Sequence, residues 1–424
     1  MNISIVKTLA LWVVLSGATI AQANTLVLTG ATVHPVSSDP IEGATVIIED
    51  GLISAVGTDL DWPADAEVTN LDGLHLYPGF VHPATQLGLQ EIGSVAGTVD
   101  TREMGSINAA IRAEVAINHD SELLPAAVAG GVLTAHVMPN GGLISGTSAV
   151  VKLDGWSWED MVIAAPTGMH INFPAEAVED DTNEDLKTIE MVLDQARHHL
   201  RAMQAAEAGE APAPPRNSQL EALAPLLSGE QALYLRANRY DVMDKALDWA
   251  TEQEFERIVL LANPDVQYIA DRLEEDNIPV ILRNVYAMPT RRWEAYDMAY
   301  VAAARLAEAG VQFTIADTGG GMDLANARNL PFQAGSAAAH GLDQSDALKA
   351  VTLWPAEILG VADQLGSIEV GKRASLFAAT GDALEAMTRI EHVWIDGKAY
   401  DLNRDPGRRL YQRYRERNAE VQAR

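Results

Sequence analysis

Three residues able to do chemistry stand at the ends of apolar runs that are typical of buried strands. His82 and Asp317 each follow such a run, and His136 lies near the end of another. The ends of parallel strands in an α/β barrel meet at one face, so these side chains could lie together. They could then hold one metal ion, or Asp317 could act as a general base toward water. A lone histidine is more often a hydrogen-bonded structural residue, and this alternative also applies to His170 and His340.

A second group of candidates follows the apolar residues 279–283. Arg283, Tyr286 and residues 291–293 could line a pocket and bind a carboxylate or a peptide-like ligand, although simple exposure to solvent explains them equally well. The sequence contains no G-x-S-x-G motif. The glycines at 319–321 are not followed by the Lys-Ser/Thr of a phosphate-binding loop. A serine-hydrolase elbow and a phosphate loop are therefore not expected.

The middle of the chain alternates strand-like and helix-like segments, which is typical of a parallel sheet covered by helices. The spacing is about 25 residues per strand–helix unit, as in a (β/α)8 TIM barrel, where catalytic groups lie just after the strands. Strands are predicted at residues 133–137, 149–153, 233–237, 257–261, 279–283 and 311–316. Helices are predicted at residues 241–251, 265–275 and 293–309.

Both ends of the chain are rich in short β-type runs with turn signals, and neither end can bury a sheet alone. We therefore expect residues 24–76 and 366–402 to combine into a small β-sandwich beside a barrel of residues 77–365. An insertion at residues 174–217 contains a predicted helix, residues 186–208, which leads into an Ala/Pro-rich hinge. The last residues, 403–424, are predicted to form a charged helical tail.

The overall composition limits the possible partners and the compartment. The 424 residues carry a formal net charge of −29, which argues against nucleic acid and anionic membranes as partners. Residues 1–23 have the features of a cleaved signal peptide: Lys7, an apolar run and an Ala-Gln-Ala cleavage site. The mature protein is therefore expected to be periplasmic or secreted, without a membrane span. The sequence has no cysteine, which excludes disulfides and thiolate ligands.

Residues 77–88 (YPGFVHPATQLG) resemble the first barrel strand of the amidohydrolase superfamily, whose pattern is Pro-Gly-Phe/Leu-Ile/Val-Asp-x-His-x-His-Leu-Gly. Residues 351–360 (VTLWPAEILG) resemble the motif T-x-N-P-A-x-x-L-G, and residues 365–376 (LGSIEVGKRASL) resemble G-S-[IL]-x-x-G-K-x-A-D-L. The resemblance is to the imidazolonepropionase-like branch and covers nearly the whole mature chain. It implies a metal-hydrolase TIM barrel with a β-sandwich built from both termini.

In this superfamily four histidines, an aspartate and often a carboxylated lysine hold the metal ions. The positions that match the four histidines are occupied here by Ala84, Gln86, Asn238 and Asn263. Asp317 keeps its carboxylate, and Lys152 matches the bridging lysine loosely or is an ordinary surface residue. Zinc prefers imidazole, thiolate or carboxylate ligands, so no tight binuclear zinc site is expected. A hard cation such as Ca²⁺, bound by the amide oxygens and Asp317, would usually have more carboxylates.

The sequence leaves two functions open. The first is a secreted pseudoenzyme that binds a small amide or peptide-like ligand, or that associates with itself or with an active paralogue. Its pocket residues would be His82, Gln86, His136, Lys152, Asn238, Asn263, Arg283 and Tyr286. The second is a working hydrolase of C–N bonds in amides or dipeptides, with Asp317 as the catalytic residue of a non-standard site.

Overall fold

The two ends of the chain build a single eight-stranded sheet. The computed structural model describes residues 25–180 and 182–422, so the predicted signal peptide at residues 1–23 lies outside the described residues. The strand order of this terminal sheet is β18-β17-β16-β5-β1-β2-β3, with β4 paired to β1. Its strands are β1 Thr25–Val33, β2 Ile41–Glu49, β3 Leu52–Gly57, β4 Glu67–Asn70, β5 His75–Pro78, β16 Leu376–Ala379, β17 Ile390–Ile395 and β18 Lys398–Ala399.

Strand β16 joins the two ends of the chain, because it pairs antiparallel with both β5 and β17. The prediction that the termini combine is confirmed, and they do so as one hydrogen-bonded sheet. Leu28, Leu376 and Trp394 belong to its apolar cluster. The β2–β3 and β17–β18 turns also meet, since a Cβ on Gly397 would lie 3.0 Å from the Gly51 Cα. Both glycines have positive φ, a conformation that favours glycine.

The middle of the chain forms the predicted α/β barrel in two hydrogen-bonded sheets. Their strand orders are β10-β9-β7-β6 and β15-β14-β13-β12-β11-β8. The sheets meet where β6 contacts β15, and there the Gln86 N–H donates to the Gly319 carbonyl at 2.9 Å. On the other side the Ser148 N–H donates to the Gly168 carbonyl at 3.2 Å. The strands are β6 Phe80–Thr85, β7 Val132–Val137, β8 Ile144–Thr147, β9 Ala149–Lys152, β10 Val162–Ala164, β11 Gly168–Asn172, β12 Ala232–Arg236, β13 Ile258–Ala262, β14 Val280–Arg283 and β15 Phe313–Ala316.

Two of these strands reverse the expected direction. β9 runs antiparallel to β7, and β8 runs antiparallel to β11. Residues 149–153 were correctly predicted as a strand, but a parallel direction for them was wrong. A parallel connection needs about a dozen residues or more, usually with a helix, and residues 138–148 already hold β8. The strand β11, which pairs parallel with β12, has no counterpart among the predicted strands.

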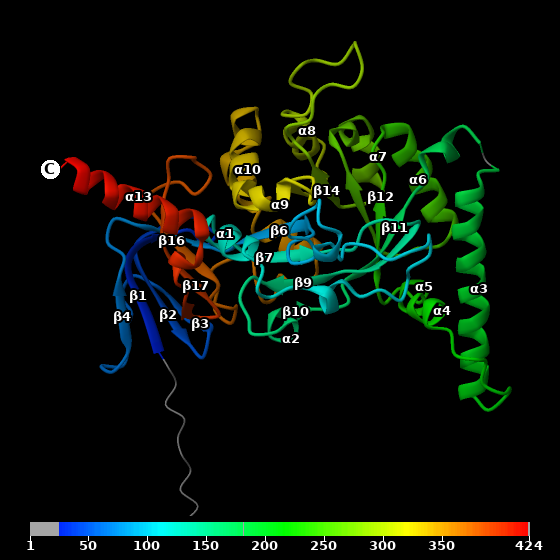
Figure 1. The fold of residues 1–424 in the computed structure, drawn as a ribbon, viewed down its shortest axis with the longest axis horizontal. Helices are drawn as coiled ribbons and strands as arrows, with labels where there is room; N and C mark the ends of the chain where they lie inside the picture. The colour runs from blue at the N-terminus through cyan, green and yellow to red at the C-terminus, as the bar shows by residue number, and fades with distance from the viewer. Residues whose placement is uncertain (1–24, 181, 423–424) are drawn as a thin grey trace, which may run out of the picture.

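Helices cover the outside of the barrel, and the long inserted helix α3 stands at the edge of the molecule farthest from the terminal sheet (Figure 1). Helix α3 begins after Asn183, whose side chain accepts the N–H groups of Asp185 and Leu186, a typical N-cap. The helices are α1 Leu123–Ala129, α2 Trp158–Met161, α3 Glu184–Glu207, α4 Ser218–Ala222, α5 Ala224–Leu227, α6 Tyr240–Glu252, α7 Ala270–Glu275, α8 Ala302–Glu308, α9 Asp323–Asn326, α10 Leu330–Ala339, α11 Gln344–Lys349, α12 Leu353–Ile358 and α13 Pro406–Gln422.

The helix predicted at residues 293–309 is much shorter than expected, since only α8 is helical there. Glu294 accounts for the absence of a helix at the start of this segment. Its carboxylate accepts the backbone N–H of Thr290 at 2.7 Å and that of Arg291 at 2.8 Å. Such side-chain to backbone bonds stabilise a turn in competition with a helix.

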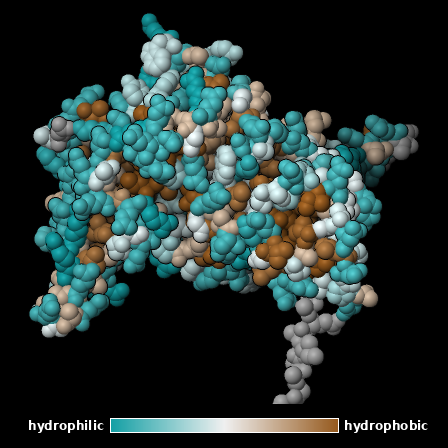
Figure 2. Space-filling view, turned by 180° about the vertical axis from the view of Figure 1, so that it is seen from behind, coloured by the Kyte–Doolittle hydropathy of each residue, from teal (hydrophilic) through white to brown (hydrophobic). Residues whose placement is uncertain are grey.

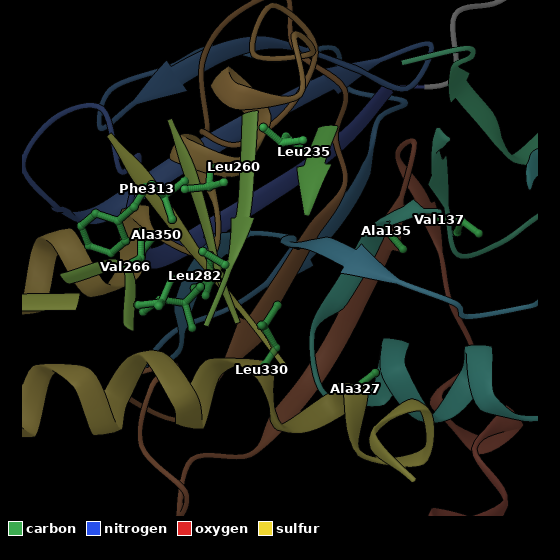
Figure 3. Close-up of a cluster of buried hydrophobic side chains, with 14 of the residues drawn as sticks. Ala135, Val137, Leu235, Leu260, Val266, Leu282, Phe313, Ala327, Leu330 and Ala350 are labelled. Carbon is green, nitrogen blue, oxygen red and sulfur yellow. The ribbon is translucent and has the colours of Figure 1, made fainter. Parts of the chain in front are cut away.

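Alternate residues on the barrel strands face the helices and the barrel interior. The helix-facing side packs into the main core, which includes Leu235, Leu260, Leu282 and Phe313 (Figure 3). A separate cluster fills the interior and includes Tyr234, Leu261, Ile281 and Ala316. Burial of each such large apolar side chain contributes about 1.5–3 kcal/mol. Arg236 and Arg283 follow Tyr234 and Ile281 by two residues, so they share the interior face at the strand ends.

The face seen in Figure 2 is largely hydrophilic, with hydrophobic areas among the polar side chains. The C-terminal helix α13 has no buried residue. It is held by Arg408, which donates to the Ile390 carbonyl at 3.3 Å. Among the described helices, none is long and apolar enough to cross a membrane.

Candidate functional site

The ends of β6 and β15 bring two of the predicted site residues together. His82 Nε2 lies 3.2 Å from Asp317 Oδ2, and both side chains are buried. The distance is that of an ion pair, although the angles are not those of a hydrogen bond. The Ala84 N–H points to His82 Nδ1 at 3.4 Å, so Nδ1 accepts and the ring proton faces Asp317. The other oxygen of Asp317 accepts the Gly319 N–H at 2.6 Å.

The three glycines after β15 pack against the strand end that carries Ala84 and Gln86. A Cβ on Gly319 would lie 2.6 Å from the Ala84 carbonyl oxygen, and one on Gly320 would lie 2.7 Å from Gln86 Oε1. Gly319 also has a φ of +77°, which non-glycine residues rarely adopt. The loop can therefore lie directly on residues 84–86 only because it lacks side chains.

His136 belongs to a buried polar network inside the barrel. Its Nδ1 donates to the Pro83 carbonyl at 2.8 Å, and its Nε2 lies 2.8 Å from Ser148 Oγ and 3.0 Å from Thr167 Oγ1. His170 Nε2 lies 2.7 Å from the same Ser148 Oγ. Burial lowers the pKa of His136 to about 4 and that of His170 well below its ordinary value, so both rings are neutral.

The Ser148–His136 pair has the spacing of a nucleophile and its base. Both residues are 0% exposed, however. Their hydrogen-bonding groups are used within the network, and Ser148 is the single residue between β8 and β9. The arrangement therefore holds the two sheets of the barrel together and is closed to a substrate.

Two arginines occupy the interior face near the mouth of the barrel, where β12 and β14 end. Arg236 Nη1 donates to Asn140 Oδ1 at 2.8 Å, and Arg283 donates to the Thr318 carbonyl. Burial first, and then the nearby charge of Arg283, lower the pKa of Arg236 to about 9. Arg283 was predicted as a pocket residue, but Arg236 was missed. The sequence pattern that could have identified Arg236 is the alternation Ala232, Tyr234, Arg236. It puts a charge at the last inward position of a buried strand.

The comparisons with known proteins agree with this architecture. Residues 255–400 match the profile of the amidohydrolase family. The crystal structure of an amidohydrolase from Thermotoga maritima MSB8 is 25% identical with a TM-score of 0.81, covering 89% of this chain and 99% of that one. The chain therefore shares the fold of this amidohydrolase, and its residues 255–400 match the amidohydrolase family.

More distant amidohydrolase-like folds include two hydrolases of known type. A phenylurea hydrolase B is 15% identical with a TM-score of 0.53, covering 89% of this chain and 97% of that one. A Xaa-Pro dipeptidase with bound methionine is 13% identical with a TM-score of 0.52, covering 89% and 100%. No curated protein matches the sequence.

The residues present do not fit the metal ions that the amidohydrolase superfamily implies. Ala84 is fully buried and offers no ligand, and Asp317 already contacts His82 and the Gly319 N–H. Within residues 25–180 and 182–422, no group of three or more His, Cys, Asp or Glu could hold a metal ion. The positive charges of Arg236 and Arg283 at the same mouth also oppose a divalent cation.

Lys152 lies away from this mouth, so its interpretation as a bridging lysine or pocket residue of the amidohydrolase site is wrong. It stands opposite Thr134 in the antiparallel β7–β9 pair, toward the amino end of β7. Its Nζ lies 2.8 Å from Asp396 Oδ2 in the terminal sheet. Asp396 also binds Arg373 at 2.6 Å. Although burial opposes it, hydrogen bonds from Arg373 and Lys152 hold the pKa of Asp396 below its ordinary value.

The remaining predicted residues lie at the rim of the mouth. Asn238, just beyond β12, is exposed and Asn263, just beyond β13, is half-buried. Tyr286 is 44% exposed and donates to the Phe332 carbonyl at 2.9 Å. In the part of the chain that the structure describes, no hydrogen bond connects these three side chains to His82 or Asp317.

Proposed function

We propose that this protein binds a small amide or peptide-like ligand at the barrel mouth and lacks metal-dependent hydrolysis. The observation that carries the proposal is the state of Asp317. One of its oxygens faces His82 and the other accepts the Gly319 N–H, so the carboxylate is held within the protein. A general base needs a free oxygen within reach of the proton that it removes.

The class of ligand follows from the superfamily. A prolidase complexed with N-methylphosphonate-L-proline shares the fold, with 16% identity and a TM-score of 0.52, as do the Xaa-Pro dipeptidase and the phenylurea hydrolase. A fold hosts many functions, so these neighbours support an amide-like ligand and leave its identity open. The proposal includes export to the periplasm or beyond, after removal of residues 1–23. A second copy of this chain or an active amidohydrolase paralogue is the proposed protein partner.

The experiment is elemental analysis of the purified protein, together with a variant in which Ala84, Gln86, Asn238 and Asn263 are all replaced by histidine. We expect no stoichiometric transition metal in the wild type. Zinc uptake by the variant alone would show that the four substitutions removed the metal site. A stoichiometric metal in the wild type would contradict the proposal. Sequencing of the mature N-terminus from the native host tests export separately.

The second candidate is a C–N hydrolase centred on Asp317, and the 3.2 Å approach of His82 to Asp317 favours it. A histidine beside a carboxylate is a common acid–base pair. If this candidate holds, the metal-free wild type should hydrolyse members of a panel of dipeptides and anilides, and Asp317→Asn should abolish that activity. No turnover by the wild type above the level of Asp317→Asn excludes it.

A further inference from the structure

Arg236 is a buried cation without a partner of opposite charge. Its Nη1 donates to Asn140 at 2.8 Å, and its Nη2 lies 3.9 Å from the sulfur of Met138. Its Nε is buried and makes no hydrogen bond. No carboxylate forms an ion pair with it within residues 25–180 and 182–422. Burial of a charge without such a partner is unfavourable, so the folded protein keeps Arg236 at a cost in stability.

Arg283 has the same character on β14, which is separated from β12 by β13 alone. Arg236 of β12 pairs with Leu261 of β13, which in turn pairs with Ile281 of β14. Arg283 lies two residues beyond Ile281. The two arginines therefore stand two strands apart, about 10 Å across the sheet. The Nε of Arg283 is also buried without a hydrogen bond, and no ion pair to Arg283 is found among the described residues.

The chain has many carboxylates that could have neutralised these charges, since it carries 59 acidic and 30 basic residues. Some half-buried arginines elsewhere are paired, such as Arg291 with Asp265 and Glu294. Asp317 and Asp323 are the acids whose charges act on the Arg283 guanidinium. The oxygens of Asp317 are engaged by His82 and Gly319, and Asp323 Oδ2 accepts from Thr318. The two arginines at the mouth are therefore left without a direct ion pair, although charged partners are abundant in the chain.

We propose that Arg236 and Arg283 bind the carboxylate of the ligand. The inference rests on the proposed function and names the class of ligand: a small amide or peptide that ends in a free carboxylate. Guanidinium groups recognise carboxylates through charge-assisted hydrogen bonds in fixed geometry. Both side chains keep partial access to solvent, and neither has a carboxylate partner among the described residues. The positive charge that two metal ions would supply in a relative is supplied here by two side chains.

The test compares anionic probes with neutral ones at constant ionic strength, with thermal unfolding and calorimetry as readouts. The carboxylate probes are N-acetyl-Ala-Ala, N-acetylalanine and acetate, the phosphoryl probe is inorganic phosphate, and the neutral probe is N-acetyl-Ala-Ala amide. The protein variants are Arg236→Gln, Arg283→Gln and the double variant. Arg216→Gln is the matched control, because Arg216 has an 89% exposed side chain on the inserted region. We expect a carboxylate probe to bind the wild type and the control equally, and each variant about tenfold or more weakly.

The outcomes separate the possibilities. Phosphate binding more tightly than every carboxylate, with the same dependence on both arginines, would overturn the carboxylate assignment in favour of a phosphoryl ligand. No anion raising the unfolding temperature of the wild type above that of the double variant would overturn the anion site altogether. Elemental analysis of the same preparations is independent of these results. Metal in the wild type defeats the proposed function, whereas metal-free protein without anion binding defeats only this inference.

Discussion

His82 Nε2 faces Asp317 Oδ2 at 3.2 Å in a part of the fold where both side chains are buried. The Ala84 N–H points to Nδ1 of His82, and Oδ1 of Asp317 accepts the Gly319 N–H. The pair is thus closed by backbone groups from the two strands that it joins, β6 and β15. Such a pair stabilises the contact between the two sheets and aligns the strand ends around the mouth.

The His82–Asp317 pair should be energetically coupled. We expect His82→Phe to lower the free energy of unfolding by about 3 kcal/mol, because it leaves a buried carboxylate without its partner. The double variant with Asp317→Leu should recover part of this loss. Urea unfolding of both single variants and the double variant measures the coupling. Simple additivity of the two effects would show that the groups do not interact, and His340→Gln, an exposed histidine, serves as the control.

The glycine loop should tolerate a side chain at one position and not at another. Gly319→Ala brings a Cβ within 2.6 Å of the Ala84 carbonyl oxygen, whereas a Cβ on Gly321 meets nothing within 4 Å. Both glycines have positive φ, +77° and +62°. We expect Gly321→Ala to cost about 1 kcal/mol from backbone strain alone, and Gly319→Ala to cost clearly more. Equal losses in chemical denaturation would refute the close packing of the loop on residues 84–86.

Arg236 should reduce the stability of the ligand-free protein. Arg236→Met removes a buried, unpaired cation and keeps an apolar side chain of similar length, so we expect a gain of about 1 kcal/mol in the free energy of unfolding. Arg272→Met is the comparison, because Arg272 binds Asp244 and Asp248, and its loss should bring no gain. A lower unfolding temperature for Arg236→Met would mean that its bond to Asn140 outweighs the burial of its charge.

Stability should fall in mild acid. Burial lowers the pKa of His136 to about 4, and burial together with the charge of His75 lowers that of His34 to about 4. Because the unfolded pKa is about 6.5, the unfolded chain binds more protons between pH 6.5 and 4. Stability is therefore full above about pH 6.5 and decreases toward pH 4. His136 accounts for a loss on the order of 3 kcal/mol in the free energy of unfolding over this range.

Urea midpoints measured between pH 7 and pH 4 test this window. His34→Gln should reduce the slope, since it removes one of the half-buried titrating groups while leaving the barrel interior intact. A variant with the same slope as the wild type would exclude His34 as a source of the acid sensitivity. The exposed His340→Gln variant should keep the wild-type slope.

Much of the fold could be predicted from local patterns. The apolar runs that became β7, β12, β13, β14 and β15 were located within a few residues, because buried strands need continuous apolar sequence. The direction of β9 could not be predicted, because residues 149–153 have the same pattern in either direction. Pairing direction depends on the length and path of the connection, and here Ser148 alone separates β8 from β9.

The site was predicted less completely than the fold. His82 and Asp317 stand out because each follows a strand, and the structure brings them together. Lys152 was misplaced for the same reason that β9 was: reversal of the strand carries it to the other end of the barrel. Arg236 was missed because a single arginine at the end of a strand is ordinarily expected to be exposed to solvent. Its burial depends on the curvature of neighbouring strands, which no local pattern contains.

The pairing of β5 with β16 determines when the terminal sheet can be completed during synthesis of the chain. Residues 75–78 emerge early from the ribosome, and their partners at residues 376–379 emerge about 300 residues later. Until then, one side of β5 has an open edge, and open edges invite pairing with other chains. Translation of nearly the whole polypeptide must therefore precede completion of the terminal sheet. A chain that ends before residue 376 would leave the edge of β5 open to pairing with other chains.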